Sequence, residues 1–315
     1  MHMLIIGSDI SSLTHLVSAT TFSVSILPSS TDVALTNILD PVLMRFRATQ
    51  KVIPNLHITK PMREAYLYPL LFTPGEEWEY GVGIDWAGWM VERVNGNISL
   101  QDYLEKNVYG PLGIKGITFH PKTKPATWAK MTDMSERSGG INRFGVAVDP
   151  EGKVEYTKHR IWNPEPSGIS AGAGGYGSPV EYYKILQSIL LDDEKILKKE
   201  TVDEMFRPQL SEASRKSYME KLRIPEVNQG FGPLPLGSKV DWGLGGNLIM
   251  EDLAGRRKGT MAWSGYPNLH WFVDRVGGVA GIYGSQINPP GDLKTVEFFE
   301  LWEKELYSKS GKEKL

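Results

Sequence analysis

Cysteine is absent from the 315 residues of this chain, which excludes a disulfide scaffold, a cysteine nucleophile and a thiolate metal site. An excess of basic charge is also missing, because 35 Lys and Arg residues against 37 Asp and Glu residues give a net charge of −2. Proteins that bind duplex nucleic acid usually need a strong positive field, so we expect no nucleic-acid partner. No apolar run approaches the ~18 residues of a membrane-spanning helix, and we expect no membrane partner.

Signals for metals, nucleotides and export are missing as well. The six histidines show no metal-ligand spacing, and the glycine-rich stretch Gly172–Gly177 lacks the Gly-Lys-Ser/Thr of a phosphate loop. We therefore expect no metal and no cofactor. Polar residues interrupt the mildly apolar segment Met1–Leu27, which has no basic leader, so the sequence predicts no signal peptide and a cytoplasmic location.

What is present is ordinary globular composition, with 41% hydrophobic and 23% charged residues. A chain of this length can bury most of its apolar surface in a core. The 33 glycines and 20 prolines are spread along the chain and do not gather in one linker. We therefore predict a single domain over residues 1–315.

Hydrophobic periodicity and turn signals place helices in the middle of the chain and at its end, and strands late in the chain. Ser99 is expected to cap one of the helices. The helices are predicted at Gly83–Asn95, Ser99–Asn107, Pro179–Leu191, Thr201–Phe206 and Leu293–Tyr307. A meander of antiparallel strands is predicted at Trp242–Met250, Lys258–Trp263, Asn268–Asp274 and Gly278–Ser285. This order is typical of an α+β protein.

Six motifs follow one another along the chain. The first is Leu70–Gly83, in which a Pro-Gly turn precedes Trp78 and Tyr80. The others are Gly83-Ile84-Asp85-Trp86-Ala87-Gly88, Tyr109-Gly110-Pro111-Leu112-Gly113-Ile114, Ser170–Tyr176, Ile196–Val202 and Trp242-Gly243-Leu244-Gly245. In this order they resemble the serine β-lactamase-like superfamily, which includes class C β-lactamases, D-alanyl-D-alanine peptidases, esterases and acyltransferases. The form of the pattern is most similar to the fungal branch, whose acyltransferases esterify polyketides.

This resemblance implies a fold and a set of site residues. The implied fold is an antiparallel sheet flanked by helices, drawn from residues 1–42 and 171–307, with a mostly helical region at about 43–170. Leu39-Asp40-Pro41-Val42 resembles a family segment that follows the nucleophile, and counting back from it reaches Ser18. Tyr80 matches the tyrosine that activates this serine.

The triplet Trp263-Ser264-Gly265 matches the strand that borders the site in esterase-like members. The following N–H, on Tyr266, is then an oxyanion donor. Trp78, Trp263, Ser264 and Gly265 are expected to contact substrate. Other interpretations stay open: Tyr80 as a packed aromatic ring, Trp263 as a core residue, and Ser18 as a chance match among many serines.

The chain departs from the family pattern at its beginning. It contains no Ser-x-x-Lys, because Thr21 stands where the motif lysine is expected. A threonine hydroxyl cannot serve as a general base near neutral pH. The segments before Ser18 and over Leu43–Pro69 are short, so we expect a family member that has lost N-terminal strands and part of its helical region.

The leading functional hypothesis is an acyl-enzyme hydrolase or acyltransferase that acts on an ester or thioester of a small secondary metabolite. Its donor could be bound to a carrier protein. One alternative is a non-catalytic protein that binds a metabolite in the same pocket. Another is a cyclase or isomerase that reuses this pocket. The missing lysine favours the alternatives, whereas Tyr80 and Trp263-Ser264-Gly265 favour the enzyme.

Overall fold

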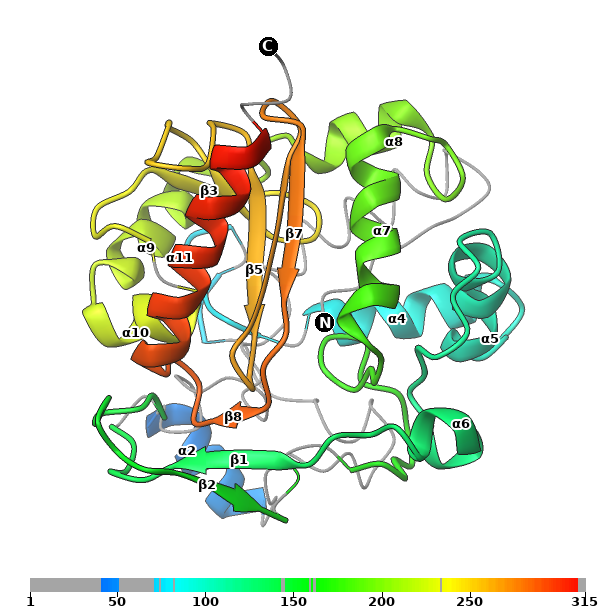
Figure 1. Cartoon of the computed structure of the whole chain (residues 1–315), viewed down its shortest axis with the longest axis horizontal. Helices are drawn as coiled ribbons and strands as arrows, with labels where there is room; N and C mark the ends of the chain where they lie inside the picture. The colour runs from blue at the N-terminus through cyan, green and yellow to red at the C-terminus, as the bar shows by residue number, and fades with distance from the viewer. Residues whose placement is uncertain are drawn as a thin grey trace. The chain divides into compact units, whose positions relative to one another are not determined.

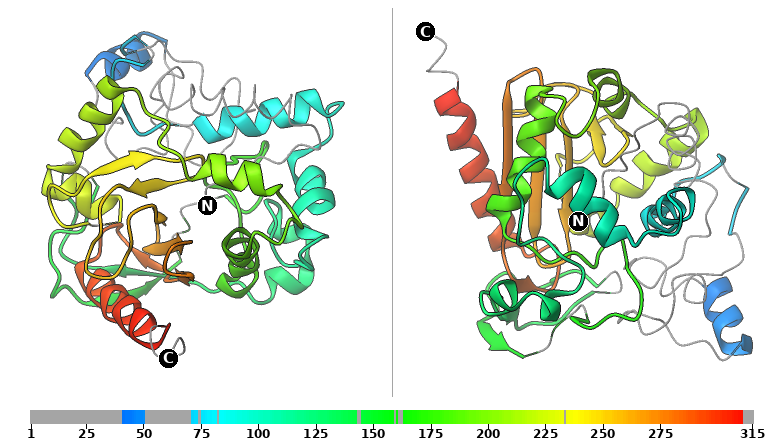
Figure 2. Two further views of the ribbon diagram at one scale, coloured as in Figure 1. Left: turned by 90° about the horizontal axis from the view of Figure 1, so that it is seen from above. Right: turned by 90° about the vertical axis from the view of Figure 1, so that its right-hand side faces the viewer.

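The computed structural model describes residues 41–50, 71–73, 75–81, 83–142, 145–158, 160, 163–232 and 234–310 (Figures 1 and 2). The chain divides into two compact units, and each is described by itself. The first unit comprises Met1–Met131, Ile161–Ser178 and Leu210–Tyr218. The second unit comprises Thr132–Arg160, Pro179–Gln209 and Met219–Leu315.

The named secondary-structure elements of the first unit are all helical. Ser99 caps α5, because its side chain accepts a hydrogen bond from the N–H of Asp102 at 3.1 Å. The predicted helices that begin at Gly83 and Ser99 are both confirmed, and the second continues through a π-helical turn. The elements are α2 (Pro41–Gln50), α4 (Gly83–Val94), α5 (Leu100–Leu104), the π-helical turn η1 (Glu105–Tyr109), the 3₁₀ turn η2 (Pro121–Thr123) and α6 (Pro125–Trp128).

The second unit contains two sheets. A five-stranded antiparallel sheet has the order β3-β4-β5-β6-β7, and a three-stranded sheet has the order β2-β1-β8 with β1 and β8 parallel. The large sheet contains β3 (Val240–Trp242), β4 (Asn247–Ile249), β5 (Met261–Gly265), β6 (Leu269–Asp274) and β7 (Val279–Tyr283). The small sheet contains β1 (Met134–Arg137), β2 (Val154–Thr157) and β8 (Ile287–Asn288).

Helix α11 (Leu293–Ser310) lies along one face of the large sheet, as Figure 1 and the right-hand view of Figure 2 show. Phe299 of α11 joins Phe272 of β6 in the apolar cluster beneath it. Helix α7 (Pro179–Leu191) packs against β6 and β7 and has the predicted bounds. The remaining helices are α8 (Lys199–Met205), α10 (Pro225–Gly230) and α9 (Glu212–Leu222), the last of which crosses from the residues of the first unit into those of the second.

The α+β prediction is confirmed, with two differences in detail. The strand predicted over Trp242–Met250 is a hairpin, in which β3 and β4 are joined by a turn at Gly243–Gly246. Gly245 has φ +129°, which side-chain-bearing residues rarely adopt, so the chain reverses there. The region predicted to be helical at about 43–170 also contains β1 and β2, because β1 pairs with β2 on one side and with the distant β8 on the other.

The predicted contribution of residues 1–42 to the sheet lies outside the described residues, apart from Pro41 and Val42, which belong to α2. The single domain over residues 1–315 stays a prediction. Within the described part, no helix combines the length and apolar character that crossing a membrane requires.

Candidate functional site

Trp78 anchors the segment that precedes helix α4 in the first unit. Its side chain is 1% exposed, and its ring lies 4.3 Å from the ring of Tyr218. Its backbone N–H donates to Ser217 Oγ at 3.2 Å. These contacts hold the backbone just before Tyr80, whereas the predicted contact of Trp78 with substrate stays a prediction.

Tyr80 follows as a partly buried phenol. Burial raises its pKa to about 12, and the negative charge of Asp85 adds to this rise. A general base would need the opposite, namely cations that lower the phenol's pKa. In these surroundings Tyr80 is therefore protonated at neutral pH and is a hydrogen-bond donor.

Asp85 lies in the first turn of α4 and is only 3% exposed. Burial raises its pKa to about 6, while the nearby Gly172 N–H limits the rise. The Gly172 N–H lies 3.4 Å from Asp85 Oδ1, and a Cβ on Gly172 would lie 3.1 Å from Oδ2. The motif Ser170–Tyr176 is therefore held closely against the start of α4.

Asp85 lies in one of the six motifs, but the motif alone predicted no role for it. The signal that could have indicated a role is a carboxylate among apolar helix residues, because a buried carboxylate needs a hydrogen-bond partner. Its partner, Gly172, is too distant in sequence for any local pattern to indicate.

In the second unit, β5 carries the predicted substrate triplet. Trp263 is buried, and its ring lies 4.6 Å from that of Trp242 and 5.6 Å from that of Phe231. This packing agrees with the core interpretation of Trp263, and its contact with substrate stays a prediction. Ser264 and Gly265 are partly exposed at the end of the strand.

Ser264 lies directly opposite His270 of β6. His270 is 5% exposed and stacks on Phe299 at 4.6 Å. Burial lowers the pKa of His270 to about 3, and the positive charge of Arg256 lowers it further, so this imidazole is neutral at pH 7. Gly232 covers the pair, because a Cβ there would lie 3.2 Å from Ser264 Cβ and 3.8 Å from His270 Nδ1.

Tyr266 lies in the turn between β5 and β6. Burial raises the pKa of its phenol, and the charge of Glu136 contributes. The predicted oxyanion donor is not this phenol but the backbone N–H of Tyr266, which directly follows Trp263-Ser264-Gly265.

Ser18 and Thr21 lie outside the described residues. Tyr80 and Tyr266 belong to different units, so their action at one site stays a prediction. Among the described residues, no group of three or more His, Asp and Glu side chains could hold a metal ion.

Comparisons with known proteins match this chain to a family and to fungal enzymes. Residues 44–302 match the family model described as Beta-lactamase. The chain is 32% identical over 244 residues to monacolin J acid methylbutanoyltransferase of Aspergillus terreus. It is 34% identical over 263 residues to lovastatin esterase of Penicillium rubens. These alignments cover 76% and 81% of this chain.

The fold is similar to that of a solved variant of simvastatin synthase from Aspergillus terreus. The TM-score is 0.78 at 31% identity, and the match covers 94% of this chain and 66% of that one. The chain spans 56% of the length of the methylbutanoyltransferase and 62% of that of the esterase.

Proposed function

Because the chain belongs to the beta-lactamase family, we propose that it is a serine acyltransferase or esterase acting on an ester or thioester of a small secondary metabolite. One observation carries the proposal: the chain retains Tyr80 and Trp263-Ser264-Gly265 and is 32–34% identical to a methylbutanoyltransferase and an esterase. Both relatives, by name, form or cleave esters of small molecules.

The proposed reaction passes through an acyl-enzyme. The Ser18 hydroxyl attacks the acyl carbonyl carbon, and the tetrahedral oxyanion accepts hydrogen bonds from the N–H groups of Ser18 and Tyr266. The carbon–oxygen or carbon–sulfur bond of the donor then breaks. The serine proton passes through Tyr80 to the leaving alcohol or thiol. A hydroxyl of the acceptor, or water, then attacks the acyl carbonyl carbon. The bond from this carbon to Ser18 Oγ breaks, and the proton of the attacking hydroxyl passes through Tyr80 to Ser18 Oγ.

The substrate class follows from the side chain at the start of the triplet. Trp263 stands where related sites carry a lysine that pairs with a substrate carboxylate. An indole offers apolar surface and no cation, so the site favours an uncharged ester or thioester. We further propose a carrier-protein-bound acyl donor and a cytoplasmic location.

A second function competes with the first on a specific observation. Thr21 supplies no cation, and burial together with Asp85 raises the pKa of Tyr80 to about 12. Both features work against removal of the serine proton. They support the alternative of a metabolite-binding protein, or of a cyclase or isomerase in which no acyl-serine forms.

A serine-reactive fluorophosphonate tests the choice between these functions. We expect slow labelling at Ser18, located by peptide mass spectrometry and abolished by Ser18→Ala. Ser12→Ala removes a nearby serine outside the motif and is the matched control, so its labelling should equal that of the natural chain. Hydrolysis of a p-nitrophenyl ester should likewise be abolished by Ser18→Ala and unchanged in Ser12→Ala.

Two other outcomes contradict the proposal. Strong labelling at a different serine would refute the assignment of Ser18. Absence of both labelling and ester turnover, in protein that unfolds cooperatively, would favour the non-hydrolytic alternative.

A further inference from the structure

The turn between β5 and β6 carries the backbone N–H of Tyr266, which the proposed function uses as an oxyanion donor. Such a donor contributes only if its direction is set before the reaction, because reorganisation during the reaction would cancel the gain. A turn that directly follows the strand triplet therefore needs anchors. The second unit provides them at Pro267 and Asn268.

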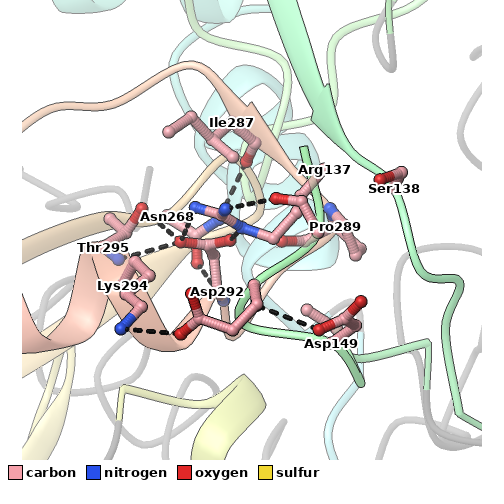
Figure 3. Close-up of polar contacts among 12 residues, drawn as sticks. Arg137, Ser138, Asp149, Asn268, Ile287, Pro289, Asp292, Lys294 and Thr295 are labelled. Atoms are coloured by element: carbon pink, nitrogen blue, oxygen red, sulfur yellow. Dashed lines mark hydrogen bonds and ion pairs between the residues drawn. The ribbon is translucent and has the colours of Figure 1, made fainter. Parts of the chain in front are cut away.

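Asn268 is 2% exposed and has φ 57°, a left-handed conformation that asparagine tolerates better than most residues. Its side-chain nitrogen donates to the carbonyl oxygens of Ile287 at 2.8 Å and Pro289 at 2.9 Å. Its side-chain oxygen accepts from the N–H of Asp292 at 3.0 Å. Both protons of the amide and its oxygen are thus used in holding the turn to the segment that follows β7 (Figure 3).

Pro267 accepts a further hydrogen bond that holds the turn. The Ser285 hydroxyl donates to its carbonyl oxygen at 2.8 Å. Two consecutive residues after Tyr266 are therefore bound to the same segment. The attachment at Asn268 is stronger than the one at Pro267, because the buried Asn268 side chain makes three hydrogen bonds.

The anchoring segment is itself fixed, because Asp292 connects it to two other elements. Its carboxylate accepts from the Thr295 N–H and hydroxyl, both at 2.8 Å, at the first turn of α11. It also pairs with Arg137 of β1, whose Nε and Nη2 both donate to it. Figure 3 shows this carboxylate between Arg137, Thr295 and Asn268.

The ionic state of Asp292 supports this arrangement. Burial works to raise its pKa, but hydrogen bonds from Arg137 and Thr295 outweigh burial and lower the pKa below its usual range. Arg137 in turn donates to the carbonyl oxygen of Gly152 at 2.7 Å. The turn therefore connects through Asn268 to a charged, buried network.

We propose that Asn268 is a positioning residue that fixes the direction of the Tyr266 N–H toward the developing oxyanion. The catalytic effect of Asn268 rests on the proposed function, whereas the hydrogen bonds by which Asn268 anchors the turn do not. Asparagine suits the position because it tolerates a positive φ and offers two donors and an acceptor on one short side chain.

The test substitutes Asn268→Gly, which permits the positive φ and removes only the side chain. Asn97→Gly is the matched control, because Asn97 has φ 60° but is exposed. Amide hydrogen exchange is followed by mass spectrometry on a peptide that contains Tyr266. We expect exchange there to accelerate about tenfold or more in Asn268→Gly and to stay unchanged in Asn97→Gly.

Ester turnover is the second measurement. We expect kcat to fall about 10- to 100-fold in Asn268→Gly with KM nearly unchanged, because the lost interaction acts in the transition state. A role in folding alone would lower the amount of active protein without changing the kcat of the folded fraction, so activity is normalised to the folded fraction.

Unchanged exchange around Tyr266 in folded Asn268→Gly would overturn the anchoring, and accelerated exchange with unchanged kcat would overturn the positioning role. If the natural chain shows no turnover, the proposed function fails, and with it the catalytic role of Asn268. The exchange result then still decides whether Asn268 anchors the turn.

Discussion

The backbone N–H of Gly172 lies 3.4 Å from the carboxylate of Asp85, although the two residues are 87 positions apart in the chain. This N–H works to lower the pKa of Asp85, yet burial still raises it to about 6. The carboxylate in turn raises the pKa of Tyr80. Asp85 therefore influences both the stability of the first unit and the proton of its predicted catalytic phenol.

Asp85→Asn should stabilise the protein at pH 8. A carboxyl whose pKa is raised by folding contributes stability at low pH, and this is lost as the pH rises through about 6. At about 1.4 kcal/mol per pKa unit, removing the charge is worth on the order of 2–3 kcal/mol. Thermal unfolding of Asp85→Asn and of the natural chain from pH 4 to pH 8 measures this difference in stability. Glu77 is exposed in the same unit, so Glu77→Gln is the control for the loss of one negative charge. A variant no more stable than the natural chain at pH 8 would contradict the raised pKa.

Gly232→Ala should destabilise the end of β5 more than its backbone strain alone explains. Gly232 and Gly237 have φ +90° and +88°, but only at Gly232 would a Cβ meet Ser264, at 3.2 Å. The unfavourable φ costs about 1–2 kcal/mol at either position, and overpacking adds about 1 kcal/mol or more at Gly232. Urea unfolding of Gly232→Ala and Gly237→Ala gives the difference. Equal losses would show that the contact with Ser264 does not contribute.

His270→Phe should protect the protein against acid. The pKa of His270 is lowered to about 3 in the folded chain, so its stabilising contribution is complete above about pH 6.5 and is lost as the pH falls toward 3. The loss is about 1.4 kcal/mol per pH unit over this window. Phenylalanine can keep the stacking on Phe299 without a site for the proton. The pH dependence of unfolding should be flatter in His270→Phe than in the control His120→Phe, and equal slopes would refute a buried neutral imidazole.

Thr21→Lys should activate the chain if Ser18 is the nucleophile. A lysine at this position would supply the missing base for the serine proton and a cation beside the site. We expect fluorophosphonate labelling of Ser18 to accelerate by about 100-fold or more. Thr20→Lys adds the same charge one residue away and should not accelerate labelling. No gain in a folded Thr21→Lys variant would argue against this motif.

Local rules predicted the elements whose signals lie within a few residues. Pro179 at the first position of a helix and Ser99 as a cap led to the observed starts of α7 and α5. Glycine turns separated most strands of the meander correctly. The same rules failed for β1, whose four residues form a strand because they pair with β2 and, at Ser135 and Glu136, with the distant β8. No periodicity within so short a segment could indicate those partners.

The sequence by itself determined the family, the α+β class and the residue types at Tyr80 and Trp263-Ser264-Gly265, because these depend on residue identity and order along the chain. Only the tertiary structure decided that Asp85 raises the pKa of Tyr80 and that Asn268 holds the turn after Tyr266. Asp85 lies only five positions from Tyr80, but it is buried beside Gly172, 87 residues further along the chain, and Asn268 binds groups about 20 residues away. Desolvation and hydrogen bonding act over a few ångströms in space, so sequence separation carries no record of them.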